Sequence, residues 1–206
     1  MKLIIRSILL LSLLMTGCVE QTKKTSTSQA NFQSLTVPKK TVEKSALEYN
    51  HKISTWTHNE VPYSGFAVTY HPNSTLKEKF GILNGLKQNE FIQYYQNGHM
   101  KNLAHYYKGK LHGEKKIWTS DSNHVLISHL NYKSGKLNGE QKKWYASGEL
   151  YKVLNMADGK EEGMQKAFRK NGDLYANYEA KNGRIFGLKK SALCYGVEDE
   201  KVQYEK

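Results

Sequence analysis

The chain has 206 residues and a formal net charge of +12 at pH 7, and 38% of its residues are hydrophobic and 24% charged. A basic chain favours an anionic partner, such as a lipid headgroup, an acidic glycan, nucleic acid or an acidic protein. The sequence contains no GxSxG, HExxH, Walker or dinucleotide-binding glycine pattern. It therefore points to no catalytic residue and to no cofactor.

The first residues, MKLIIRSILLLSLLMTGC, have the features of a secretory leader. Lys2 and Arg6 precede an apolar run that is too short for a lasting membrane span, and two small residues stand before Cys18. The run LMTGC resembles a bacterial lipobox, and the resemblance implies cleavage before Cys18 and lipidation of its thiol and its new amino group. The alternative is an ordinary signal peptide followed by a cysteine by chance.

Lipidation would place the mature protein in the cell envelope, because more than one acyl chain makes membrane anchoring stable. Residues 1–17 are thus predicted to be a lipoprotein signal peptide. The mature chain is predicted to face an extracytoplasmic space from a membrane, the outer one in a Gram-negative cell, and export argues against nucleic acid as a partner. Acylation of Cys18 leaves Cys194 alone, which excludes a disulfide framework and CxxC metal or redox chemistry.

Residues 18–50 are predicted to form the lipid anchor and a flexible tether. The run 20–41 is polar and rich in Ser, Thr, Gln and Lys, and it has too little apolar surface to build a core. Residues 42–50 fit either a short helix or more linker.

The segments GKLHGEKKIW and GKLNGEQKKW begin 26 residues apart, at Gly109 and Gly135, and they belong to a longer repeat. When the second glycine of each is taken as an anchor, further anchors follow at intervals of 24 residues, with one interval of 26. A fixed period of this size indicates a repeat array. The six anchors are Gly65, Asn89, Gly113, Gly139, Gly163 and Gly187.

Other places in the repeat also hold residues of one type. A glycine stands four residues before each anchor from the second onward. An aromatic stands five residues after each of the first five anchors, and a leucine or methionine stands at the start of the strand that follows. We predict that both rows pack on the sheet, in preference to an aromatic platform for a ligand. The aromatic row is Tyr70, Tyr94, Trp118, Trp144 and Phe168, and the leucine row is Leu76, Met100, Leu126, Leu150 and Leu174.

Each repeat is predicted to be a β-hairpin. Glycines recur too often for helices, since each costs about 1 kcal/mol relative to alanine inside a helix. Apolar residues of equal parity, such as Leu150, Leu154 and Met156, indicate a strand with one buried face, and dipeptides such as Asn97-Gly98 supply the turns. The predicted fold is all-β: an elongated antiparallel β-meander of 24-residue hairpin repeats over residues 51–187, followed by a capping segment, residues 188–206.

The aromatic, the turn glycine and the following Gly-Lys-x-x-Gly, as in YASGELYKVLNMADGKEEG and YQNGHMKNLAHYYKGKLHG, resemble the variant MORN repeat. Proteins with such arrays are grouped as YwqK-like antitoxins, and many of them are lipoproteins. The resemblance covers residues 62–187 and implies the repeat fold, while the antitoxin label follows the array and not a catalytic motif. The chain departs from the pattern at Asn89, at the sequence HPNS (71–74) and at an insertion near Asp121. Asparagine tolerates the left-handed conformation, so the first departure is mild.

The candidate binding surface is the position three residues before the anchor. It holds a basic residue in four successive repeats, and equivalent turns should line one edge of the sheet at steps of about 10 Å. The alternative is that exposed turns carry basic residues for solubility alone. The four residues are Lys110, Lys136, Lys160 and Arg184.

No metal site is predicted. The eight histidines occupy unrelated places in the repeat, although the register allows His124 and His129 to lie near His99 or His105 on adjacent strands. Cys194 is expected on a closing strand as a small apolar residue, and a reactive or metal-binding thiol is the alternative.

These features predict a non-enzymatic binding or scaffold module that is anchored to a membrane and directed at a protein or an anionic surface of the envelope. The pieces outside the repeats are too short for a catalytic domain. The alternatives are an antitoxin-like protein that neutralises a partner toxin and an accessory subunit of an envelope enzyme.

Overall fold

A computed structural model describes residues 36–188 of the chain. The predicted leader, the lipidation site Cys18 and Cys194 lie outside these residues and stay predictions. Within the described range, no helix has the length and the apolar character needed to cross a membrane.

The regular structure of the described residues is β-strand apart from one 3-10 turn, η1 (Lys44–Ala46). The strands are β1 (Thr41–Glu43), β2 (Glu48–Asn50), β3 (Thr55–His58), β4 (Val61–Pro62), β5 (Gly65–Tyr70), β6 (Leu76–Leu83), β7 (Leu86–Tyr94), β8 (Met100–Tyr107), β9 (Lys110–Trp118), β10 (Leu126–Lys133), β11 (Lys136–Leu137), β12 (Gly139–Trp144), β13 (Leu150–Ala157), β14 (Lys160–Glu161), β15 (Gly163–Phe168), β16 (Leu174–Lys181) and β17 (Arg184–Leu188).

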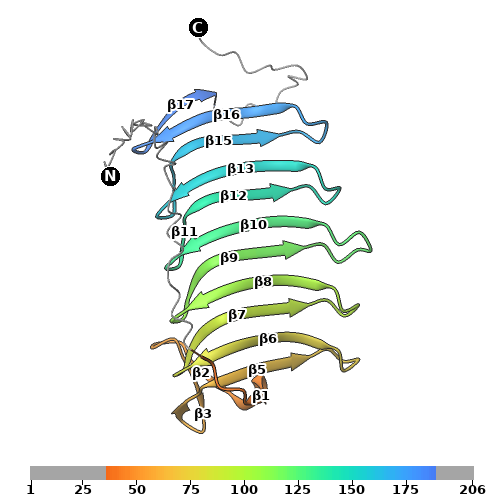
Figure 1. The fold of residues 1–206 in the computed structure, drawn as a ribbon, viewed down its shortest axis with the longest axis vertical. Coiled ribbons are helices and arrows are strands. Elements are labelled where there is room, and N and C mark those ends of the chain that lie inside the picture. Colours follow the sequence, from red (N-terminus) through yellow and green to blue (C-terminus); the bar gives the residue numbers. More distant parts are fainter. Residues whose placement is uncertain (1–35, 189–206) are drawn as a thin grey trace, which may run out of the picture. The chain divides into compact units, whose positions relative to one another are not determined.

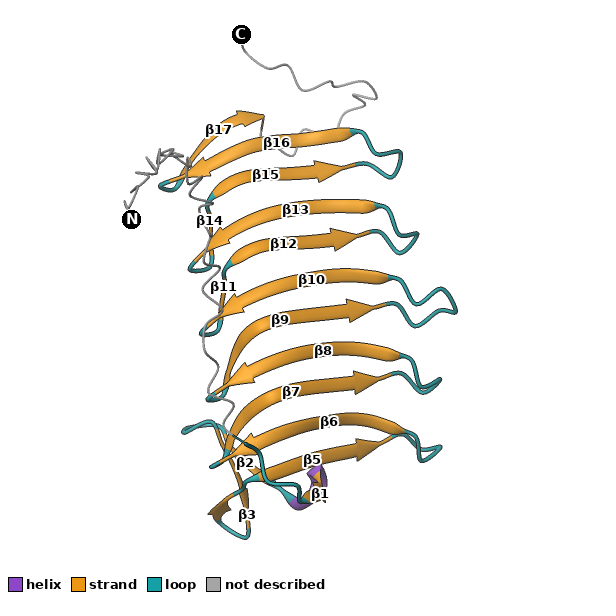
Figure 2. Ribbon diagram, in the orientation of Figure 1, coloured by secondary structure: helices purple, strands orange, loops and turns teal. Residues whose placement is uncertain are grey.

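From β5 onward the strands form one antiparallel meander, in which each hairpin pairs with the next along the chain (Figure 1). The short strands β11 and β14 pair with β10 and β13, and β1 joins β5 in parallel at the end of the sheet. A separate sheet contains β2, β3 and β4. The turns collect along two opposite edges of the large sheet (Figure 2). The prediction of an all-β meander of successive hairpins is therefore confirmed.

Two-residue turns lead from one repeat into the next, and both central residues have positive φ. The values are 48° and 80° in Lys108-Gly109, and 48° and 84° in Asp158-Gly159. This is the type I′ pattern, whose backbone twist matches that of the flanking strands. Asn89 has a φ of 62° at the anchor position, so asparagine does adopt the left-handed conformation there.

At the opposite edge, each hairpin closes through one residue of positive φ. Gly98, Gly148 and Gly172 hold this place, with φ of 84°, 103° and 89°. Where the sequence lacks the glycine, Ser74 (63°) and His124 (47°) hold it instead. The His-Pro-Asn-Ser segment and the insertion near Asp121 thus close their hairpins through the same left-handed residue, even though the glycine signal is missing.

The serine in this left-handed position gives a direct test of backbone strain. Ser74→Gly is expected to raise the free energy of unfolding by about 0.5–1 kcal/mol, because a left-handed backbone costs a residue with a Cβ roughly 1–2 kcal/mol and the greater unfolded-state entropy of glycine offsets part of the gain. The reciprocal change Gly98→Ser, where a Cβ would meet open space, should lower it by a similar amount. Urea unfolding, monitored by tryptophan fluorescence, measures both changes. A loss of stability in Ser74→Gly would contradict the left-handed backbone conformation at Ser74.

The aromatic row pairs with the leucine row across each hairpin. Trp118 lies opposite Leu126, and Trp144 lies opposite Leu150, with a register shift beside each pair. Both rings are half-buried, as is Phe168. These three rings therefore pack on the sheet without being enclosed, because a single layer of strands supports them. Tyr70 of the same row is 48% exposed, so the predicted packing is wrong for this residue.

The apolar core of the described residues lies at one end of the large sheet. Phe80 and Ile82 of β6 are 1% and 0% exposed, and they pack with Leu47 and Tyr63 from the segment that precedes the sheet. The same cluster contains Ala67, Phe91 and Ala104, with Val42, Trp56, Tyr106 and Leu111 packed against it.

Residues 36–50 are part of this folded end, whereas their composition predicts a tether. β1 pairs with β5, and the side chains of Val37 and Leu47 are buried. The segment is polar, but its few apolar side chains meet the first hairpins of the array. Ordered structure thus begins before residue 51, where the repeat pattern places the start of the array.

Candidate functional site

The four basic residues of the predicted edge occupy one structural position. Lys110 begins β9, Lys136 begins β11, Lys160 begins β14 and Arg184 begins β17, each directly after a two-residue turn. All four side chains are exposed. We call these four residues the basic column.

Successive turns along this edge contact one another. The amide of Gly135 donates to the carbonyl of Leu111 (2.7 Å), and the amide of Gly159 donates to that of Leu137 (2.8 Å). Two turns also lie over the column residue of the preceding repeat, since a Cβ at Gly135 would be 3.9 Å from the Cβ of Lys110 and one at Gly159 would be 3.8 Å from the Cβ of Lys136. A Cβ at Gly183 would meet nothing within 4 Å, so the column is continuous from Lys110 to Lys160, with a step of two strand spacings, or about 10 Å.

The charges around the column differ from one repeat to the next. Further lysines accompany Lys110 and Lys136 in the same turns, whereas Lys160 has Asp158 in its turn and Glu161 beside it in β14. None of the four column residues forms an ion pair with another residue of the described range. Acidic neighbours in the turn or beside it are therefore found at Lys160, whereas Arg184, like Lys136, has a lysine three residues before it.

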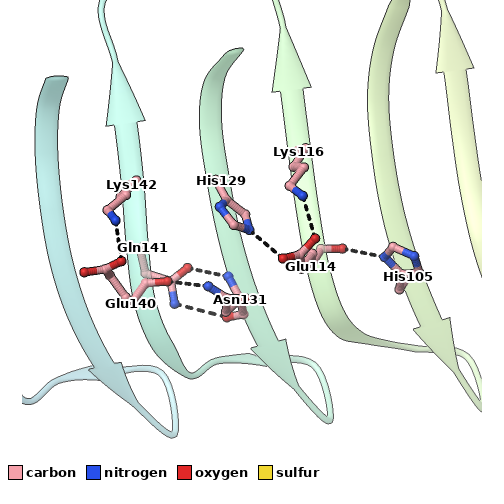
Figure 3. A network of polar contacts seen from close by, with 8 residues as sticks. All are labelled: His105, Glu114, Lys116, His129, Asn131, Glu140, Gln141 and Lys142. Atoms are coloured by element: carbon pink, nitrogen blue, oxygen red, sulfur yellow. Dashed lines mark hydrogen bonds and ion pairs between the residues drawn. The ribbon is translucent and has the colours of Figure 1, made fainter. Parts of the chain in front are cut away.

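On the strands next to the column, charged side chains are paired with one another (Figure 3). Glu114 accepts a hydrogen bond from Lys116 (2.6 Å), and His129 Nε2 lies 3.1 Å from its other carboxylate oxygen. The ring of His105 contacts the Glu114 carbonyl through Nδ1 (3.1 Å). The hydrogen bond from Lys116, outweighing partial burial, holds the pKa of Glu114 below its usual value. Lys116 is therefore paired locally, as is Lys142, which lies 2.7 Å from Glu140, in contrast to the column.

Two buried glutamines form hydrogen bonds to the backbone where the strand pairing is interrupted, between β11 and β12 and between β14 and β15. The Gln141 side chain accepts from the amide of Asn131 (2.8 Å) and donates to the carbonyls of Asn131 (3.1 Å) and Gly139 (3.0 Å) (Figure 3). Gln165 makes the same contacts with Asn155 in the next repeat. Sequence reasoning missed both residues. The one signal in the sequence that could have drawn attention to them is the recurrence of glutamine two residues after the anchor in successive repeats.

Of the histidines that the register allows to meet, only His99 and His124 are in ring contact, since His105 on β8 and His129 on β10 are separated by β9. The ring centroids of His99 and His124 are 4.9 Å apart, and His124 also stacks on Trp118 and contacts the Met100 carbonyl (2.7 Å). Between residues 36 and 188, no three or more His, Cys, Asp or Glu side chains are grouped in a way that would hold a metal ion.

A hollow of about 310 Å³ lies over β13, β15 and β16. Its lining mixes Lys152 and Lys166 with Glu161, whose carboxylate accepts a hydrogen bond from the Tyr178 hydroxyl (3.0 Å). Burial, followed by this carboxylate, raises the pKa of Tyr178 to about 12. Because its lysines and its carboxylate carry opposite charges, this hollow favours neither anions nor cations.

A larger groove, of about 450 Å³, lies at the first member of the basic column. Lys110 lines it together with Lys108, Tyr49, Trp56 and Tyr106. We call it the aromatic groove. It joins the column to the apolar cluster around Phe80, because Trp56 and Tyr106 also pack against that cluster.

Compared with known proteins, the chain matches no family model and no curated sequence.

Proposed function

We propose that the protein is a non-enzymatic repeat protein, held on a membrane of the cell envelope by lipid on Cys18, that presents its basic column to an acidic protein or an anionic surface. In this proposal the hairpins are repeats of the variant MORN type. The observation that supports it is the column itself: four basic residues at one position of successive repeats, all exposed. They make no ion pair within the described residues.

Such a column binds weakly at each residue and gains strength from repetition. An exposed ion pair contributes only about 0–1 kcal/mol. The step of about 10 Å is close to the Debye length of about 8 Å at physiological salt, so the fields of neighbouring members partly overlap. Contacts that form together on one partner add in avidity when the geometry allows simultaneous engagement. A partner with repeated anionic groups therefore suits the column better than a single small anion.

The test is the binding of the full chain to polyphosphate, a soluble polyanion, measured by calorimetry at about 0.01 M and about 0.15 M salt. We expect affinity to fall steeply between the two, because exposed charges are screened. Reversing Lys110, Lys136, Lys160 and Arg184 together to glutamate should abolish binding while leaving the unfolding midpoint nearly unchanged, since exposed turn side chains carry little packing.

The matched control reverses four lysines that do not belong to the basic column, namely Lys23, Lys24, Lys39 and Lys77. Lys39 and Lys77 are exposed, and Lys40 is avoided because its ammonium lies 5.0 Å from the ring of Tyr63. The control changes net charge by the same amount. Equal losses in both variants would show that net charge alone matters, and no loss in either would assign the positive charge to solubility.

A further inference from the structure

The aromatic groove is built from two parts of the fold. Tyr49 and Trp56 come from the small sheet, and Leu86, Lys87 and Tyr106 come from β7 and β8 of the large one. Its volume of about 450 Å³ is within the range of small-ligand sites. The indole Nε1 of Trp56 is buried away from solvent, so this residue contributes a ring face to the groove and no accessible donor.

The lysine in the floor of the groove lies among aromatic rings. The ammonium of Lys87 is 4.7 Å from the ring centroid of Phe91, 4.9 Å from that of Phe80 and 5.1 Å from that of Tyr106. Burial lowers the pKa of Lys87, opposed by the nearby carboxylate of Glu78. Ring faces attract this cation but accept no strong hydrogen bond from it, so an anionic oxygen entering the groove would improve its solvation.

The groove has no acidic residue in its lining, although three lysines, Lys87, Lys108 and Lys110, line it. Glu78, whose carboxylate acts on Lys87, is outside the lining and already accepts hydrogen bonds from Lys44 (2.9 Å) and Gln93 (2.8 Å). The groove therefore combines an uncompensated positive charge, hydrogen-bond donors and ring faces in one place.

We propose that the aromatic groove binds one acidic saccharide unit, a sugar ring that carries a carboxylate. The C–H face of the ring would pack on Tyr49 and Trp56, and its carboxylate would pair with the ammonium groups of Lys87, Lys108 and Lys110. This site is separate from polyanion binding along the column, and the two share Lys110 alone.

The groove chemistry selects this ligand over related ones. A small anion without a ring leaves the aromatic faces uncovered, and a neutral sugar leaves the lysines unpaired. Apolar ligands would leave the ammonium groups without acceptors, which is unfavourable for buried polar groups. A ring with one apolar face and one acidic substituent satisfies the ring faces and the lysines together.

The experiment titrates the full chain with digalacturonate and follows the three tryptophan indole N–H signals by NMR, with Trp56→Phe to assign the Trp56 signal. We expect the Trp56 signal to shift with saturation, while the signals of Trp118 and Trp144 stay in place. Cellobiose, citrate and the dipeptide Glu-Tyr should each bind at least about tenfold more weakly, a difference of about 1.4 kcal/mol. Absence of a Trp56 shift, or an equal response to any of the three other probes, would overturn the proposal.

The repeat provides a matched pair of variants. Lys110→Gln should weaken digalacturonate binding at least threefold, and Lys136→Gln, which removes the same charge from the equivalent position one repeat away, should leave it unchanged. Tyr49→Leu, at the rim of the groove, should weaken it as well. Equal losses in Lys110→Gln and Lys136→Gln would refute the groove as a site. Polyphosphate binding, in contrast, should respond equally to both lysine variants, so failure of the groove and failure of the column are distinguishable.

Discussion

Gln141→Leu is expected to lower the free energy of unfolding by roughly 2–5 kcal/mol, although it replaces a polar residue with an apolar one of similar size in the folded sheet. The Gln141 side chain is 1% exposed and is bonded to backbone groups of β10 and of the first residue of β12, beside a break in the strand pairing. Without it, the amide of Asn131 and the carbonyl of Gly139 lose these partners. Each unsatisfied buried group costs about 1–3 kcal/mol.

The measurement is urea unfolding together with hydrogen exchange at the Asn131 amide, which should become markedly faster in the variant. Lys115→Leu is the matched control, because Lys115 has the same place in the third repeat but lies within the unbroken strand β9. That control should change stability by less than about 1 kcal/mol, as expected for a partly exposed residue. A neutral Gln141→Leu would show that water or a neighbouring strand satisfies these backbone groups.

Phe80→Ala should lower the free energy of unfolding by about 3–5 kcal/mol, the usual cost of removing a fully buried ring. Phe80 is 1% exposed and lies between the rings of Trp56 (centroids 5.5 Å apart) and Phe91 (5.8 Å). Its removal leaves a cavity beneath the small sheet and weakens the attachment of the segment that covers this end.

Leu154 holds the same place in the repeat as Phe80 but is only half-buried. Leu154→Ala should therefore lower stability by about 1–2 kcal/mol, roughly half of the cost at a buried leucine. Thermal and urea unfolding of the two variants measure the difference. Equal losses would mean that the face of the sheet around β13 is covered as fully as the face around β6, contrary to the exposure seen in the described residues.

The repeat register, the strands and the turns could be read from the sequence, because each depends on neighbouring residues. Pairs such as Asp158-Gly159 specify a two-residue turn by the backbone angles they tolerate, and the alternation of Leu150, Leu154 and Met156 specifies a strand. The basic column follows directly, since residues at one place in successive turns must line one edge.

The location of the core was decided by the tertiary structure alone. Alternating apolar residues occur in every repeat, so the pattern cannot distinguish the face around Phe80, which is covered, from the face around Leu154, which is partly open. What distinguishes them is the preceding segment, whose Val37 and Leu47 come from a stretch of polar composition. Their burial depends on a long-range contact with the first hairpins.

The same reason applies to the aromatic groove and to the buried glutamines. Trp56 and Tyr106 are 50 residues apart in the chain and meet only because the small sheet packs against the large one. Gln141 matters because its amide lies beside a break in the pairing of β10 with its neighbour, and neither its residue type nor its local sequence reveals that break. The sequence by itself determined the repeated hairpin and its charged edge, while packing between distant segments decided which residues are buried and where a ligand site forms.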